Sequence, residues 1–321
     1  MPGSAVMTRN QFPPALAPGL RHIFIHWLDL KEHMPQYPHY MNEDTSDRAY
    51  EIDWELSGTA PMPILTEGSA PATDGLISGG TKKVVHLEYG LLSEVTRQLV
   101  DDDLYRVFMR MPESHARSGM FSREAACCSL FNLGGTSITT TNGATLFNTA
   151  QPLMGGPAAT GIAPNISTII NSSGTYPNRP NPDADLTMTS LQQAITMIAL
   201  QPDDRGIPIH VKPKYLVHTV QQRRNVRELL GSPGVPGSGN NELNWLIGEN
   251  LVGLELNYLT SANAWFLLAE KEGHQLKFYE RKSLAAATDD DFKTQVLLFR
   301  SNQRFGVVAT SWRGTFGSYA A

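Results

Sequence analysis

Hydrophobic and polar positions alternate with a period of two in the segment that follows residue 81. The apolar members of the pattern are Val85, Leu87, Tyr89, Leu91 and Val95. This alternation predicts a long strand with one apolar face. A second strand is predicted at about 49–57, and the loop 59–81 between them is too long for a tight turn. The two strands predict a projecting hairpin, whose edge and apolar face need another copy of the chain to cover them.

Helical spacing follows further along the chain. Apolar residues in 113–132 recur on one stripe and predict a helix long enough to support a flat domain. A shorter helix with an acidic first turn is predicted at 101–111, and Pro112 is expected to interrupt it. Nearer the N-terminus, residues 1 to about 20 are rich in proline and expected to be extended, and the apolar segment 20–30 favours a strand.

The second half of the chain mixes both patterns. Residues 133–185 read as loops, and Thr189 with Gln192 predicts the capped start of a helix. A buried strand is predicted next, followed by a basic helix that ends at Gly231. Four further strands are predicted at 250–258, 264–270, 276–282 and 295–314. This order predicts an α+β fold with a mixed sheet.

Composition narrows the function. Charged residues make up 18% of the 321 residues, and the net charge of −5 argues against a nucleic-acid coat held by bulk positive charge. Cys127 and Cys128 are adjacent, which disfavours a disulfide and favours a reducing compartment. With neither a signal-peptide pattern nor a membrane-length apolar run, the chain is expected to be soluble and made in the cytosol.

The segment 45–58 holds a cluster of carboxylates that includes Asp47. Acid–base catalysis needs carboxylates on a rigid scaffold, with at least one of them desolvated. On a strand, Glu51, Asp53 and Glu55 would point to one face in a row, and we expect that face to be too exposed for a catalytic pair. Ion pairing between subunits is the interpretation that we prefer, and reversing all three to lysine should block assembly of a still folded subunit.

Other candidate sites are weaker. His22 and His26 have the spacing of metal ligands on a helix, but their segment favours a strand and lacks the glutamate of the HExxH motif. Three arginines in 221–230 are interpreted as a solvated or inter-subunit face. Phosphate-binding and nucleophile motifs are absent from the sequence. We therefore expect no catalytic residue, no cofactor and no metal.

Several segments, taken together and in order, resemble one family. They are TSDRAYEIDWELSG, TEGSAPATD, KKVVHLEYGLLSEVTRQLVDDDLY, ARSGMFSREAACCSLFN, GATLFNTAQPLMGG, LQQAITMIALQPDDRGIPIHVKPKYLV, AWFLLAE and SWRGTFGSYAA. The chain resembles tailed-bacteriophage major capsid proteins of the Mu-like major head subunit kind, from about residue 14 to the end. That resemblance implies the Hong Kong-97 type (HK97-like) capsid fold.

The resemblance also implies a division of the chain. Residues 1–48 would be an N-terminal arm and 49–97 an extended loop called the E-loop. The peripheral P-domain, with a long spine helix and a surface loop, would take 98–185. The axial A-domain would take 186–270, and 271–321 would hold returning P-domain strands and a C-terminal A-domain segment.

In such a shell the carboxylate segment would overlap neighbouring subunits. The expected interface residues are Arg48, Tyr50, Glu51, Asp53, Glu55, Lys82 and Lys83. The two lysines are candidate partners of the carboxylates, and Tyr50, Trp54 and Tyr89 are expected to be buried beside them. Some members of the fold crosslink a lysine to an asparagine, but nothing near Lys82 or Lys83 marks such chemistry, so crosslinking is not expected.

The implied function is a structural one. The subunit would assemble into pentamers and hexamers of an icosahedral shell that encloses double-stranded DNA, with weak, non-specific contact to it. A separate scaffolding protein, a portal and possible decoration proteins are the expected partners, with assembly in the host cytoplasm and the virion as destination. An encapsulin-like compartment shares the fold, and genomic neighbours would distinguish it. A hydrolase with an unrecognised site is the other alternative, which a compact monomer would support.

Overall fold

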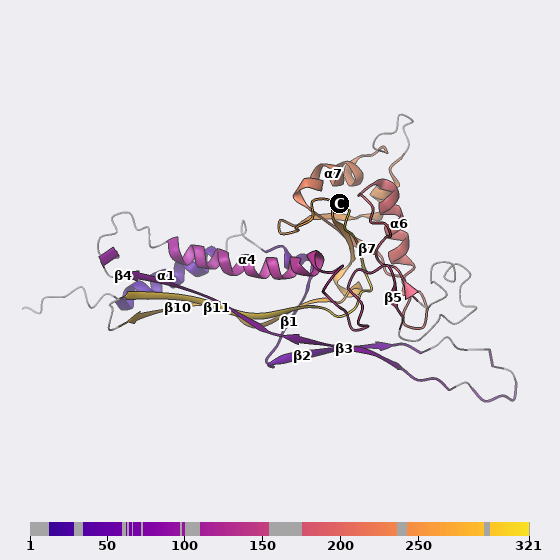
Figure 1. The fold of residues 1–321 in the computed structure, drawn as a ribbon, viewed down its shortest axis with the longest axis horizontal. Helices are drawn as coiled ribbons and strands as arrows, with labels where there is room; N and C mark the ends of the chain where they lie inside the picture. The colour runs from indigo at the N-terminus through magenta and orange to yellow at the C-terminus, as the bar shows by residue number, and fades with distance from the viewer. Residues whose placement is uncertain are drawn as a thin grey trace, which may run out of the picture.

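The computed structural model describes residues 13–28, 35–59, 62, 64–65, 67–71, 73–96, 98–99, 110–153, 175–235, 243–291 and 296–320. Helices and strands are mixed, which confirms the α+β class. The molecule is elongated, with a long sheet beneath a helix at one end and a second group of strands and helices at the other (Figure 1). None of the helices in these ranges is long and apolar enough to cross a membrane.

The long sheet has the strand order β1-β10-β11-β4. Its strands are β1 (Asn42–Thr45), β4 (Leu87–Thr96), β10 (Leu276–Asp291) and β11 (Val296–Ala309). The helix α4 (Arg110–Asn132) lies along this sheet (Figure 1). The helix α1 (Pro13–Leu28) packs beside α4, and Phe24 of α1 contacts Phe299 of β11 edge to face, with ring centroids 6.3 Å apart.

The second sheet has the order β12-β9-β7-β8 and is mixed, as predicted. Its strands are β7 (Pro213–His218), β8 (Val252–Glu255), β9 (Trp265–Ala269) and β12 (Thr315–Ser318). The helices packed with it are α6 (Met188–Ala199) and α7 (Arg223–Gly231). Every residue of β9 is buried, because it is a central strand with side chains packed on both faces.

A third unit is the hairpin of β2 (Tyr50–Ser57) and β3 (Ile77–Val85), which pair antiparallel. This hairpin projects from the body of the molecule (Figure 1). The short elements are α2 (Tyr37–Tyr40), β5 (Gln151–Pro152), β6 (Thr175–Tyr176), η4 (Val220–Gln222), η5 (Trp245–Glu249) and η6 (Lys271–Gly273).

Several local predictions were wrong. Segment 20–30 is helical over its described part, because Leu20, Phe24 and Trp27 have helical spacing and form a buried stripe. Pro112 lies in the first turn of α4, where the missing N–H costs nothing, so it does not end a helix there. The predicted helix 101–111 lies outside the described residues, apart from its last two positions.

Other boundaries moved as well. The predicted long strand after residue 81 is two strands, β3 and β4, separated at His86, and each belongs to a different sheet. The helix α6 begins after Thr187 rather than Thr189, because Thr187 and Ser190 form the capping box. The predicted strand 276–282 is the first half of β10, which continues to Asp291.

Candidate assembly interface

The two faces of β2 are unusual for a strand next to a protein body. Its acidic residues Glu51, Asp53 and Glu55 point inward, while Tyr50, Ile52, Trp54 and Leu56 point outward. Trp54 is 64% exposed, whereas Asp53 is only 9% exposed. The prediction that the three carboxylates share one face is confirmed, but the expectation that this face is exposed was wrong.

Asp53 is held by β10 and the residue that follows β11. Its carboxylate accepts hydrogen bonds from the hydroxyls of Tyr279 at 2.7 Å and Thr310 at 2.6 Å. The ammonium of Lys277 lies 3.2 Å away. Burial, and next the bond to Asp53, raise the pKa of Tyr279, so the phenol stays protonated and donates. A buried carboxylate with these three partners is an anchor for the hairpin.

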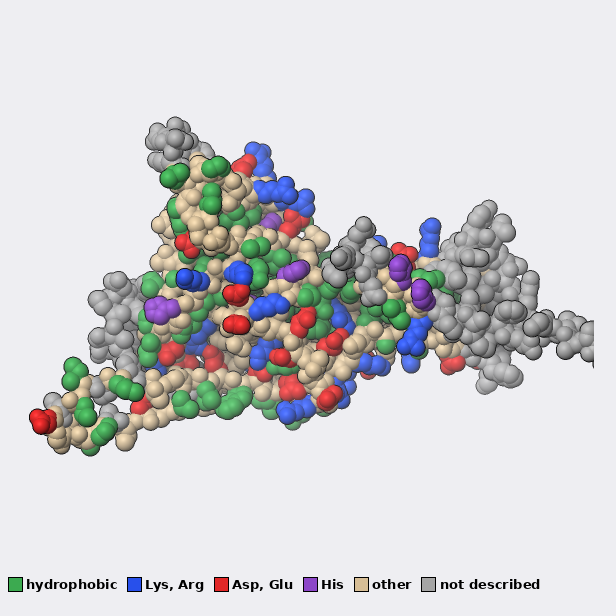
Figure 2. All heavy atoms as spheres, turned by 180° about the vertical axis from the view of Figure 1, so that it is seen from behind, with side chains coloured by type: hydrophobic (Ala, Val, Ile, Leu, Met, Phe, Trp, Pro, Cys, Tyr) green, Lys and Arg blue, Asp and Glu red, His purple; other side chains and the backbone are tan. Residues whose placement is uncertain are grey.

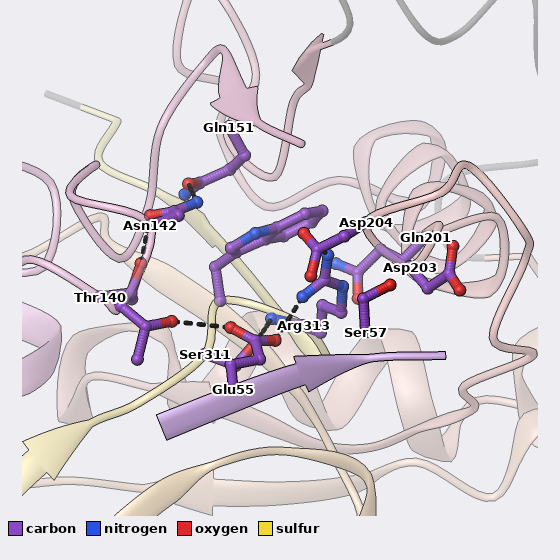
Figure 3. Close-up of polar contacts among 12 residues, drawn as sticks. Glu55, Ser57, Thr140, Asn142, Gln151, Gln201, Asp203, Asp204, Ser311 and Arg313 are labelled. Carbon is purple, nitrogen blue, oxygen red and sulfur yellow. Dashed lines mark hydrogen bonds and ion pairs between the residues drawn. The ribbon is translucent and has the colours of Figure 1, made fainter. Parts of the chain in front are cut away.

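Glu55 joins the hairpin to the second sheet region (Figure 3). Its carboxylate pairs with the guanidinium of Arg313 and accepts hydrogen bonds from Ser311 at 2.9 Å and Thr141 at 2.7 Å. Arg313 also pairs with Asp204 at 2.8 Å. Because these side chains come from four distant segments, the network fixes the base of the hairpin to the body.

Glu51 has a more peripheral position. It accepts a hydrogen bond from Ser46 at 2.6 Å and lies 3.4 Å from Arg48, whose side chain is largely exposed. An exposed pair of this kind contributes little to stability. Arg48 therefore keeps a guanidinium available to solvent.

The two lysines of β3 have different contacts within the subunit. Lys82 is paired in register with Asp53, and its ammonium donates to the Thr139 hydroxyl at 2.7 Å. Burial lowers the pKa of Lys82. Lys83 lies on the outer face, with its ammonium 4.1 Å from the ring centroid of Tyr50. Whether either lysine reaches a carboxylate of another subunit stays a prediction.

Close backbone contact also fixes β3. A Cβ atom at Gly80 would lie 1.7 Å from the carbonyl oxygen of Thr141, so only glycine fits this approach. The hairpin therefore meets the 139–145 turn directly through its backbone.

The outer face of the hairpin leaves apolar side chains in solvent. The exposed members on β2 and β3 are Tyr50, Ile52, Trp54, Leu56 and Val85. Further out on the loop, Met62 and Ile64 are 97% and 96% exposed. Hydrophobic side chains are visible along the underside of the hairpin in Figure 2. We call the exposed apolar residues of β2 and β3 the outer face. Tyr89, in contrast, is partly buried and stacks on Phe305 with ring centroids 4.6 Å apart.

Sequence reasoning missed the residues that bind the carboxylates. Tyr279, Thr310 and Arg313 lie more than 220 positions after β2. The signal available was the reversed pattern of β2 itself, in which acids alternate with large apolar residues. An alternating strand does not say which of its faces is inward, and only the tertiary contacts decide this.

Comparison with solved structures places this arrangement in a known class. The chain resembles the procapsid of bacteriophage JBD30, with 13% identity, a TM-score of 0.53, and coverage of 98% of this chain and 77% of the other. It also resembles the capsid of the cyanophage P-SCSP1u, with 11% identity, a TM-score of 0.56, and coverage of 90% of this chain and 88% of the other. A virus-like particle from Pyrococcus furiosus is similar with 8% identity, a TM-score of 0.54, and coverage of 94% of this chain and 99% of the other. The fold is the Hong Kong-97 type shell fold, as predicted.

The family follows from the sequence comparison. A family model described as "Phage capsid protein" matches residues 81–317, and no curated protein matches the chain. The chain belongs to the phage capsid protein family, because the matching family model covers more than half of it. It forms an oligomeric shell, and its location is the capsid of the virion.

Proposed function

We propose that the subunit assembles into pentamers and hexamers of an icosahedral head, and that the hairpin β2–β3 is the arm that clasps a neighbouring subunit. The observation that carries this proposal is the reversed strand β2. Its carboxylates bind groups of their own chain, and its large apolar side chains face water. An apolar surface of this kind marks a site of association.

The contacts of the inward carboxylates determine which face of the hairpin is available to a neighbour. Asp53 and Glu55 bind residues of both sheet regions, so the inner face of the hairpin is fixed on the body and its outer face is left free. A neighbour can then cover Tyr50, Ile52 and Trp54 without breaking the inner-face contacts of Asp53 and Glu55. These side chains are 45–64% exposed in the lone subunit, so covering each one contributes on the order of 1 kcal/mol.

The remaining assignments belong to the same proposal. The domain boundaries are those implied by the resemblance: arm 1–48, E-loop 49–97, P-domain 98–185, A-domain 186–270 and the returning segment 271–321. A separate scaffolding protein, a portal and decoration proteins are the partners, with assembly in the host cytoplasm. Contact with packaged DNA is weak and non-specific, and the protein carries out no catalysis. The encapsulin-like alternative has no observation that favours it over the phage head.

Substitution on the outer face tests the clasp. Trp54→Asp should leave the subunit folded, because Trp54 is largely exposed, and should prevent closed shells. Folding is checked by circular dichroism and urea unfolding, and shells by negative-stain electron microscopy with light scattering. Trp54→Phe is the matched control and should still form shells. Normal particles from Trp54→Asp, in wild-type yield, would overturn the proposal.

Reversal of the three carboxylates is a poorer test than the sequence suggested. Lysine at positions 53 and 55 would face Lys277 and Arg313 inside the chain, so the variant should lose stability as well as assembly. Only Glu51→Lys, at the partly exposed position, separates the two effects.

A further inference from the structure

The solvent face of α1 carries two histidines one helical turn apart. His22 and His26 are both exposed, and their rings are stacked nearly parallel, with centroids 6.4 Å apart and planes 9° apart. The opposite face of α1 holds Leu20, Phe24 and Trp27, which are buried against α4 and β11. The two imidazoles therefore lie side by side on a helix whose other face is packed against the body.

The helical conformation of α1 makes His22 and His26 suitable as metal ligands. A metal site at His22 and His26 was disfavoured because the segment was expected to be a strand. On a helix, positions i and i+4 lie on one face, which is the arrangement that brings two imidazoles to a common ion. The ring separation is small enough for rotation of two exposed side chains to complete the approach, since zinc–nitrogen bonds are about 2.0–2.1 Å long.

We propose that His22 and His26 form a two-ligand chelate for a divalent transition metal ion such as Zn²⁺ or Ni²⁺. Imidazole nitrogen suits these borderline ions, whereas Mg²⁺ prefers oxygen. In the part of the chain that the structure describes, no group of three or more His, Cys, Asp or Glu side chains could hold a metal ion. The remaining coordination positions are thus left to water or to a donor from another molecule.

Chelation across one turn has a mechanical consequence for α1. An ion that joins residues 22 and 26 stabilises the helical conformation between them, because it binds the helix and not the unfolded segment. Phe24 lies within that turn and contacts Phe299 of β11. The ion therefore also stabilises the packing of α1 on the long sheet.

The test uses the unassembled full-length subunit, so it does not depend on shell formation. Titration calorimetry with Zn²⁺ and with Ni²⁺ should show one site per chain, and Mg²⁺ should show none. Hydrogen exchange should show greater protection of residues 20–28 with Zn²⁺ than without it.

Variants decide whether this pair is the site. His22→Gln and His26→Gln should each weaken binding at least about tenfold and abolish the added protection. His39→Gln, at an exposed histidine outside α1, is the control and should bind like the wild type. Unchanged affinity in the His22 and His26 variants would overturn the proposal, as would zinc binding that leaves the exchange of α1 unaffected.

Discussion

At the scale of single residues, paired charges hold the hairpin on the body, beside one small apolar cluster of Val84, Tyr279 and Val308. Arg313 is the central residue, because its guanidinium pairs with Glu55 of β2 and with Asp204 of the turn after α6. All three side chains are largely buried. A buried pair need not add stability over an apolar substitute, but removing one partner leaves the other charge uncompensated.

Replacement of Arg313 should therefore be costly. Arg313→Met leaves two buried carboxylates without their cation, and the free energy of unfolding should fall by about 3 kcal/mol. Urea unfolding monitored by fluorescence measures the change. Arg224→Met is the control, since Arg224 pairs with Glu228 on an exposed helix face and its loss should be undetectable. Equal effects of the two substitutions would contradict the anchoring role.

A buried histidine gives a pH dependence with a definite sign. His274 is 1% exposed, and burial, followed by the charge of Lys271, lowers its pKa from 6.5 to about 4. The folded state keeps this ring neutral, while the unfolded chain takes up a proton below pH 6.5. Its stabilising contribution is complete above pH 6.5 and is lost as the pH falls toward 4, a decrease of about 3 kcal/mol.

The variant His274→Gln should show a shallower decline of unfolding free energy over that range. His86, His115 and His218 also have lowered pKa values and keep part of the slope in the variant. Urea denaturation at several pH values makes the comparison. An unchanged slope would show that His274 is not a major source of acid sensitivity.

At the scale of elements, the sequence predicted those whose patterns are local. The helix after Pro112, the strand at 213–218 and the basic helix ending at Gly231 have clear periodicity or caps, and all are present. The segment 20–30 was misassigned, because its β-branched and aromatic residues favour a strand locally while packing against α4 favours a helix. The break at His86 was missed, because both flanking strands continue the same alternation and only their partners differ.

The cap of α6 is a local feature with a measurable energy. The Thr187 side chain accepts a hydrogen bond from the backbone N–H of Ser190 at 3.2 Å. Thr187→Ala should lower the free energy of unfolding by about 1 kcal/mol, because an N-terminal N–H loses its acceptor. Thr196→Ala, at an exposed position of the same helix, should change it by less than about 0.5 kcal/mol. Thermal unfolding of both variants tests the assignment.

At the scale of the whole molecule, the site was less predictable than the fold. The sequence pointed to the right segment of β2, since acids and aromatics concentrate there. It did not show that Asp53 and Glu55 bind residues of their own chain. Their partners are distant in sequence and come close to β2 only when β10, β11 and the residues after them fold beside it. Residue order along a strand gives its faces, and the fold decides what each face meets.

The reversed strand also governs the behaviour of the chain before any particle exists. While a subunit is alone, Trp54, Ile52 and the loop residues Met62 and Ile64 remain hydrated at a free-energy cost. Above a threshold concentration the lone subunit is therefore less stable than the assembled one, as a detergent monomer is above its micellar threshold. Dilute solutions should contain single subunits, and above the threshold concentration the subunits should assemble abruptly. Where no ordered assembly is available to add to, the exposed apolar side chains should cause precipitation instead.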